Sequence, residues 1–212
     1  EKVFLMGGAQ AIAALSLGTE TVPKVDKIFG PGNSYVTAAK QYAQNFGTAM
    51  DMPAGPSELL VVAGKGSEPA FVAADLLSQA EHGTDSQVVV LSQDLSLMQA
   101  IQSELKKQLE VLPRKAIASA ALENSFGICF EQEDELFAFC NAYAPEHLIL
   151  AGDLDPSVVL KIQNAGSIFL GNWSCETAGD YASGTNHTLP TAGAAKAYAG
   201  VSTDSFMKKI TV

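Results

Sequence analysis

The continuous apolar run Leu59-Leu60-Val61-Val62-Ala63 decides the fold class of this chain. Such a run predicts a β-strand that is covered on both faces, which is typical of a parallel sheet. A helix-forming segment at 69–82 and a second apolar run, Val88-Val89-Val90-Leu91, follow it. A strand, a helix and a strand in this order predict parallel pairing through a right-handed crossover. Residues 59–91 therefore predict an α/β fold.

The same alternation extends on both sides of this region. Short apolar runs predict further strands at 3–6, 27–29, 128–130, 147–150 and 167–170. Helical periodicity or helix-forming composition predicts further helices at 9–15, 34–45, 94–112, 134–144 and 156–164. Ser34 is the expected N-cap of the helix at 34–45. Together these elements predict mainly parallel, twisted sheets flanked by helices, in the form of incomplete Rossmann-like lobes.

Composition narrows the class of protein. The 212 residues are 47% hydrophobic and carry 13 basic against 23 acidic side chains, a net charge of −10. The hydrophobic share excludes general disorder, and the acidic balance argues against binding to nucleic acid or to an anionic membrane. No apolar run approaches the roughly 20 residues that span a bilayer. We expect a soluble, cytoplasmic protein. The opening at Glu1, just before an apolar stretch, suggests a sequence trimmed from a longer one.

The cysteines point to the same compartment. Cys129, Cys140 and Cys175 are an odd number and lack the spacing of a metal site. We therefore expect free thiols in a reducing environment.

Gln79 and His82 form the first candidate site. They lie three residues apart in the helix expected at 69–82, so their side chains share one face and can bind a common centre. Gly83 is a natural residue for the position after a helix, which places His82 in the last turn. The alternative is a polar helix end exposed to water.

Glu146 and His147 form the second candidate site. A carboxylate beside an imidazole provides two bases suited to successive proton transfers. Adjacent residues of a strand point to opposite faces, so both reach one pocket only at a strand edge or a turn, which Pro145 supports. Functional residues usually gather beyond the carboxyl ends of strands, whereas this pair begins one. The alternative is a surface pair without a role.

A polar stretch, 172–193, shows little periodicity and is expected to be a long loop that is either functional or disordered. It carries Asp180, a hard oxygen donor, and His187. All three histidines thus lie near carboxylates or amides, which predicts a single zinc-type site. Near the N-terminus, Gly7-Gly8-Ala9-Gln10 can offer helix amides to a phosphate, although a plain tight turn explains the glycines equally well.

Six motifs, in their order along the chain, resemble the histidinol dehydrogenase family. They are GGAQA at 7–11, GPGN at 30–33, DMPAGPSE at 51–58, QAEHG at 79–83, PEHL at 145–148 and GTNHTLPT at 184–191. The resemblance covers essentially the whole sequence. It corresponds to the central and C-terminal part of the family's chain, without its N-terminal half and its C-terminal tail.

The resemblance implies an NAD-dependent oxidation of L-histidinol through L-histidinaldehyde to L-histidine, the last two steps of histidine biosynthesis. It implies zinc ligands at Gln79, His82 and Asp180, and NAD contacts at Gln10 and Asn33. His147 would be the general base for the alcohol, and Glu146 would activate the water that attacks the aldehyde. The implied substrate contacts are Ser57, Gln79, His82, His147, Asp180 and His187.

The resemblance also implies parts that this sequence lacks. In the family's homodimer, a C-terminal tail carries a fourth zinc ligand, a histidine, and a substrate-binding glutamate into the partner's site. We therefore expect the 212-residue chain alone to be inactive, to bind zinc weakly or not at all, and to self-associate through exposed strand edges. The expected domains are the end of the NAD lobe (1–56), the second half of the catalytic lobe (57–200) and the start of the tail (201–212).

Two other functions remain open from the residues alone. A zinc-dependent hydrolase explains the pair at 146–147, with Glu146 activating a metal-bound water. It leaves Gln10 and the glycine-rich loop at 30–33 without a role. A non-catalytic dimerisation or binding module is the second alternative.

Overall fold

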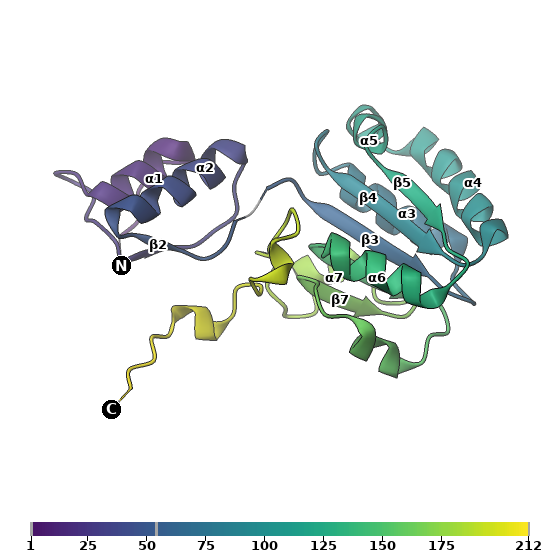
Figure 1. Ribbon diagram of the computed structural model, residues 1–212. Helices are drawn as coiled ribbons and strands as arrows, with labels where there is room; N and C mark the ends of the chain where they lie inside the picture. The colour runs from purple at the N-terminus through teal and green to yellow at the C-terminus, as the bar shows by residue number, and fades with distance from the viewer. Residues whose placement is uncertain (1, 54, 212) are drawn as a thin grey trace.

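The chain forms two groups of secondary-structure elements in the computed structural model, which describes residues 2–53 and 55–211 (Figure 1). The first group is small and pairs two helices with a two-stranded parallel sheet. Its elements are α1 (Gly8–Leu17), β1 (Lys27–Ile28), α2 (Ser34–Ala43), the 3₁₀ helix η1 (Gln44–Phe46) and β2 (Ala49–Met50).

The second group is built on a five-stranded sheet in the order β5-β4-β3-β6-β7. Every neighbouring pair in it is parallel. The decisive apolar run forms the central strand, in which Leu59, Leu60 and Val61 are completely buried. The predicted α/β class with parallel sheets is therefore confirmed. The strands are β3 (Glu58–Ala63), β4 (Gln87–Ser92), β5 (Phe126–Cys129), β6 (His147–Ala151) and β7 (Ser167–Leu170).

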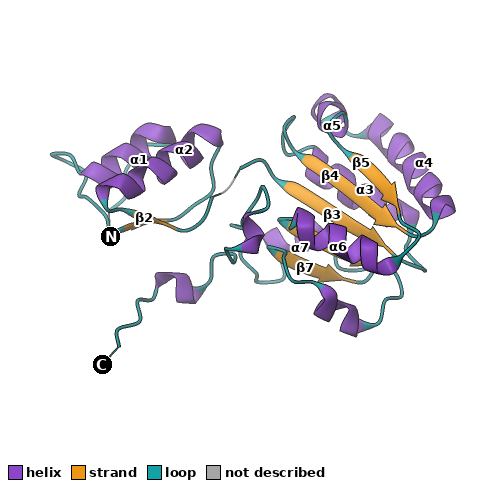
Figure 2. Ribbon diagram, viewed as in Figure 1, coloured by secondary structure: helices purple, strands orange, loops and turns teal. Residues whose placement is uncertain are grey.

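Helices cover both faces of this sheet (Figure 2). On one face, Leu59 and Val61 pack into a core with α3 (Pro69–Ala80), α4 (Leu95–Val111) and α5 (Lys115–Leu122). On the other face, Leu60 and Val62 pack against α6 (Glu133–Tyr143) and the 3₁₀ helix η2 (Pro156–Lys161). The alternate burial of one continuous apolar strand is what produces this three-layer arrangement. The remaining elements are α7 (Glu176–Tyr181), η3 (Ala194–Lys196) and η4 (Thr203–Phe206).

Local signals account for several helix ends. The Asp94 carboxylate accepts hydrogen bonds from the Ser96 and Leu97 amides, at 2.8 and 3.2 Å, and so caps α4. α6 ends in Ala144, whose positive φ of 55° turns the chain toward Pro145 and β6. Within the described ranges, no helix is both long enough and apolar enough to cross a membrane.

Two expectations for the N-terminal group are wrong. Residues 3–6 form no strand; Val3 is 90% exposed, and β1 pairs with β2 instead. An apolar run becomes a strand only where a neighbouring backbone completes the ladder, and among the described residues none does so here. The N-cap of α2 is Asn33 rather than Ser34, because the Asn33 side chain accepts from the Val36 amide at 3.1 Å.

Other corrections concern short elements. The helix expected at 156–164 is a 3₁₀ helix over Pro156–Lys161, and α5 was not expected at all. α3 ends at Ala80 with Glu81 as its C-cap, so His82 lies beyond the helix and Gly83 is not a left-handed cap. The polar stretch at 172–193 contains α7.

α7 approaches the sheet closely at one glycine. A Cβ atom at Gly179 would lie 2.8 Å from the Phe169 ring on β7, so the glycine permits a close approach of helix and strand. The contact joins a helix to a separate strand. A search for periodicity looks only at neighbouring residues and therefore misses this helix.

Truncation of Leu148 tests the core beneath β6. Its side chain is completely buried in the cluster that includes Leu60 and Leu150. We expect Leu148→Ala to lower the free energy of unfolding by about 3 kcal/mol, because it removes buried methyl groups and leaves a cavity. Urea titration measures the change. Leu160→Ala, at a side chain 86% exposed, is the control and is expected to change stability by less than about 0.5 kcal/mol. Equal losses of unfolding free energy in the two variants would contradict the assignment of Leu148 to the core.

Alkylation distinguishes the three thiols, none of which is in a disulfide. Burial raises the pKa of Cys140 to about 12, whereas the Cys129 and Cys175 side chains are exposed. We expect iodoacetamide at about pH 8 to modify Cys129 and Cys175 in the folded chain and to spare Cys140. Mass spectrometry counts the adducts, with the denatured chain as the control for full reaction. Rapid modification of Cys140 in the folded chain would refute its burial.

Candidate active site

The candidate residues converge on the amino edge of the five-stranded sheet, not on its carboxyl edge. His147 is the first residue of β6 and is level with Leu59 at the start of β3. α3 runs back from the carboxyl edge because the crossover to the parallel strand β4 requires it, and so brings Gln79 and His82 to the same edge. Ligand sites of open α/β sheets usually lie beyond the carboxyl ends of the strands, so this general rule does not predict the position of this site.

Glu146 and His147 are held by one residue of the neighbouring strand. The Glu58 amide donates to Oε2 of Glu146 at 3.0 Å, and the Glu58 carbonyl oxygen lies 3.3 Å from Nδ1 of His147. A carbonyl only accepts, so this contact assigns the proton to Nδ1 and leaves the Nε2 lone pair free. Because Glu146 precedes the strand, both side chains border one pocket.

Burial shifts the pKa values of Glu146 and His147 in the directions that favour their neutral forms. Desolvation raises the pKa of Glu146 to about 8, against the opposing hydrogen bond from Glu58. Desolvation lowers the pKa of His147 to about 4. At neutral pH, His147 is thus an unprotonated base, and Glu146 titrates near the range in which it can both accept and release a proton.

The raised pKa of Glu146 gives a stability prediction. Between about pH 4.5 and pH 8 the unfolded chain ionises Glu146 while the folded chain keeps the proton, so stability falls as pH rises through this interval. Glu146→Gln removes this loss, and its amide oxygen still accepts from Glu58. We expect the free energy of unfolding of the variant to exceed that of the parent by about 2 kcal/mol at pH 8 and by much less at pH 5. Thermal unfolding of zinc-free protein at both pH values measures the difference; a gap independent of pH would contradict it.

A pocket of about 190 Å³ brings six of the predicted residues together. Its remaining lining comes from Pro31, Gly55, Leu189 and Thr191. The hydroxyl of Thr191 accepts from the Gly55 amide and so joins the loop that carries His187 to the entry of β3. The predicted residues that line the pocket are Ser57, His82, Glu146, His147, Asp180 and His187.

Gln79 is completely buried and does not itself line the pocket. Its Nε2 atom is 3.2 Å from Nδ1 of His82. Its Oε1 atom has no hydrogen-bond partner in the part of the chain that the structure describes. A buried, unpaired amide oxygen is costly unless something binds it, and amide oxygen, imidazole and carboxylate are donors that zinc accepts. Gln79, His82 and Asp180 therefore fit a zinc site.

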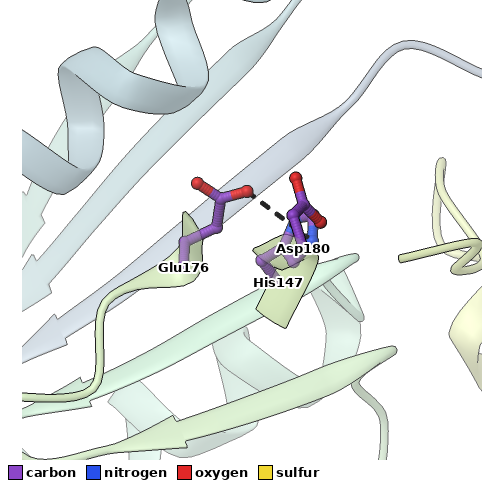
Figure 3. Close-up of side chains that lie close together, drawn as sticks. All are labelled: His147, Glu176 and Asp180. Atoms are coloured by element: carbon purple, nitrogen blue, oxygen red, sulfur yellow. Dashed lines mark ion pairs between the residues drawn. The ribbon is translucent and has the colours of Figure 1, made fainter. Parts of the chain in front are cut away.

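Glu176 lies close to these residues, although it was not among the site residues predicted from the sequence. One ligand atom each of His147, Glu176 and Asp180 lies within 4.8 Å of the others (Figure 3). Glu176 and Asp180 are four residues apart in α7, so they share one face of that helix. This spacing was a usable signal, but it carries weight only once 176–181 is known to be helical.

The predicted cofactor contacts lie elsewhere. Gln10 is exposed in the first turn of α1, and Asn33 uses its side-chain oxygen to cap α2. Of the glycine-rich loop at 30–33, only Pro31 reaches the pocket. A buried ion pair between Lys40 and Asp51 fixes this loop, because Lys40 also donates to the Gly30 carbonyl at 2.8 Å.

Comparison with known proteins shows the family to which the chain belongs. The sequence model described as histidinol dehydrogenase matches residues 1–212.

The chain belongs to the histidinol dehydrogenase family.

A histidinol dehydrogenase of Bacteroides thetaiotaomicron is 57% identical over 210 residues, which are 99% of this chain and 49% of the relative. One from Xanthomonas euvesicatoria pv. vesicatoria is 58% identical over 212 residues, 100% of this chain and 49% of that relative. The crystal structure of the Elizabethkingia anophelis histidinol dehydrogenase superposes with a TM-score of 0.91 at 62% identity, covering 96% of this chain and 47% of that one. The chain thus spans about half the length of its histidinol dehydrogenase relatives. The family resemblance of the six motifs is confirmed.

Proposed function

We propose that the full-length enzyme containing this sequence oxidises L-histidinol to L-histidine with NAD, through L-histidinaldehyde, in the last two steps of histidine biosynthesis. One observation carries the proposal. Two buried proton-accepting residues, Glu146 and His147, line the same pocket as His82 and Asp180 in a chain of this family. A single pocket with two bases suits a reaction that needs two successive deprotonations.

In the first oxidation, His147 acts as the general base. Its unprotonated Nε2 takes the hydroxyl proton of histidinol. Bound NAD would supply the acceptor for the hydride that leaves the carbinol carbon, so this step would yield the aldehyde and NADH. The Glu58 carbonyl at 3.3 Å from Nδ1 holds the ring in the orientation and tautomer that this step needs. Ser57, His82, Asp180 and His187 surround the space in which substrate would lie.

In the second oxidation, Glu146 acts on water. Its carboxylate takes a proton from the water whose oxygen adds to the aldehyde carbon, and the aldehyde oxygen gains a proton to complete the hydrate. A further bound NAD would supply the acceptor for the one hydride left on this carbon, and a proton would leave as the carboxyl group forms. The Glu58 amide fixes Oε2 at 3.0 Å, so the carboxylate needs no reorganisation at the moment of reaction. With both steps, one histidinol, one water and two NAD+ would give one histidine with an ionised carboxyl group, two NADH and three protons.

We propose Gln79, His82 and Asp180 as the zinc ligands. Bound zinc would hold the substrate's imidazole and amine and thereby orient its alcohol. The unpaired Oε1 of Gln79 supports this assignment, since in the described part of the chain it lacks any other partner.

We propose that Gln10 and Asn33 contact NAD, a hydride acceptor. Both lie at the amino end of a helix, and α1 begins without a side-chain cap, so its first amides are free to meet a phosphate. This supports assigning residues 1–56 to the NAD lobe, 57–200 to the catalytic lobe and 201–212 to the start of the tail.

We further propose that the full-length enzyme is a homodimer and that its compartment is the cytoplasm. Two exposed thiols outside any disulfide, Cys129 and Cys175, suit a reducing environment. The 212-residue chain alone is proposed to be inactive and to bind zinc weakly, because three zinc ligands are present where the family resemblance implies four.

NADH absorbance tests the proposed function. The full-length enzyme is expected to form two NADH for each histidine, to lose this activity after chelation and to regain it with zinc. The isolated 212-residue chain serves as the comparison. Absence of NADH formation from histidinol, with hydrolysis of an activated ester in its place, would overturn the proposal in favour of a hydrolase.

A further inference from the structure

Glu176 is a completely buried carboxyl group with one unused oxygen. Its Oε2 atom accepts from the Ser78 hydroxyl at 3.1 Å. Its Oε1 atom, by contrast, has no hydrogen bond within residues 2–53 and 55–211. Burial of a carboxylate with a free oxygen is unfavourable unless a positively charged or hydrogen-bonding group appears opposite it. The position of Oε1 identifies that group.

Oε1 of Glu176 lies 3.9 Å from Nε2 of His147 (Figure 3). The opposite ring nitrogen, Nδ1, faces the Glu58 carbonyl at 3.3 Å. The imidazole is therefore placed between a carbonyl on one side and a carboxyl on the other. A separation of 3.9 Å is too long for a hydrogen bond, as expected while Nε2 carries only a lone pair.

We propose that Glu176 is a positioning residue for His147, an inference that rests on the proposed function. When Nε2 receives the hydroxyl proton of histidinol, the ring becomes positively charged. Oε1 lies 3.9 Å from that nitrogen, so the negative charge of the carboxylate stabilises the charged ring without a hydrogen bond to it. No new bond to substrate is involved, because Glu176 acts through His147 alone.

Ser78 and α7 explain how the carboxylate is held. Ser78, on α3, places its Oγ atom 3.1 Å from Oε2 and 2.9 Å from the Asp75 carbonyl oxygen, so these two acceptors share its single hydroxyl proton. Glu176 itself lies in the first turn of α7, which Gly179 allows to approach Phe169 on β7. Two packed elements thus fix the carboxyl group, so its aim at His147 does not depend on a mobile side chain.

The test separates the charge of Glu176 from its shape, using the full-length enzyme. Glu176→Gln keeps the size and removes the charge, whereas Glu176→Asp keeps the charge and shortens the side chain. We expect kcat for histidinol to fall about 10- to 100-fold in the Gln variant and less in the Asp variant, with KM within about threefold of the parent. Glu133→Gln, at a surface carboxylate paired with Lys161, is the matched control and should leave kcat within about twofold.

Three results would overturn the proposal. The first is an unchanged kcat in Glu176→Gln. The second is the reverse order, with Gln more active than Asp, which indicates that only shape matters. The third is a loss of bound zinc whose replacement restores full activity, which makes Glu176 a residue of the metal site. Failure of the parent enzyme to reduce NAD with histidinol refutes the proposed function itself, and the role of Glu176 falls with it.

Discussion

Replacement of His147 by asparagine is expected to lower kcat for histidinol about 1,000-fold in the full-length enzyme. The asparagine amide can still donate to the Glu58 carbonyl, which now lies 3.3 Å from Nδ1, so the local backbone keeps its partner. What the variant loses is the Nε2 lone pair. Without that base, the hydroxyl proton has no acceptor when the hydride leaves, and the first oxidation slows. Initial rates of NADH formation measure the effect.

His187→Asn provides a comparison at the same pocket. His187 lines the pocket but is exposed in the loop after α7. As a proposed substrate contact it should influence binding, so we expect its variant to raise KM more than it lowers kcat. Equal kcat losses in the two histidine variants would argue that His147 is no more than another contact with substrate.

Replacement of Glu146 by glutamine is expected to divide the reaction into its two halves. Oxidation of the aldehyde should slow about 100- to 1,000-fold, because no carboxylate remains to deprotonate the attacking water. Oxidation of the alcohol should change far less, since His147 keeps its position and its unprotonated form. The glutamine oxygen still accepts from the Glu58 amide, which is 3.0 Å from Oε2 in the parent.

Product ratios measure this division. Histidinol and histidinaldehyde are supplied separately, and NADH is compared with histidine formed. In Glu146→Gln the ratio should rise above two, as aldehyde is released before its oxidation. The same fractional loss with both substrates would show that Glu146 serves both steps, contrary to the proposed assignment.

The sequence predicted the sheet well because its signals are local. The run at 59–63 is apolar at every position, and each of its residues faces one of two cores. Asp94 likewise marks the start of a predicted helix, and its carboxylate caps α4 at that position. The strand expected at 3–6 failed for the opposite reason: an apolar run needs a neighbouring backbone, which its own residues do not supply.

The fold class, the family and the residues proposed for the site follow from the sequence alone, because motifs, strand runs and helix caps consist of neighbouring residues. The position of the proposed site and the residues that support it depend instead on long-range contacts. The register of β3 and β6 brings the Glu58 backbone, 88 residues away in the chain, to Glu146, and the packing of α7 on β7 turns Glu176 toward His147. Such contacts follow from the pairing of distant segments, and no local spacing encodes that pairing.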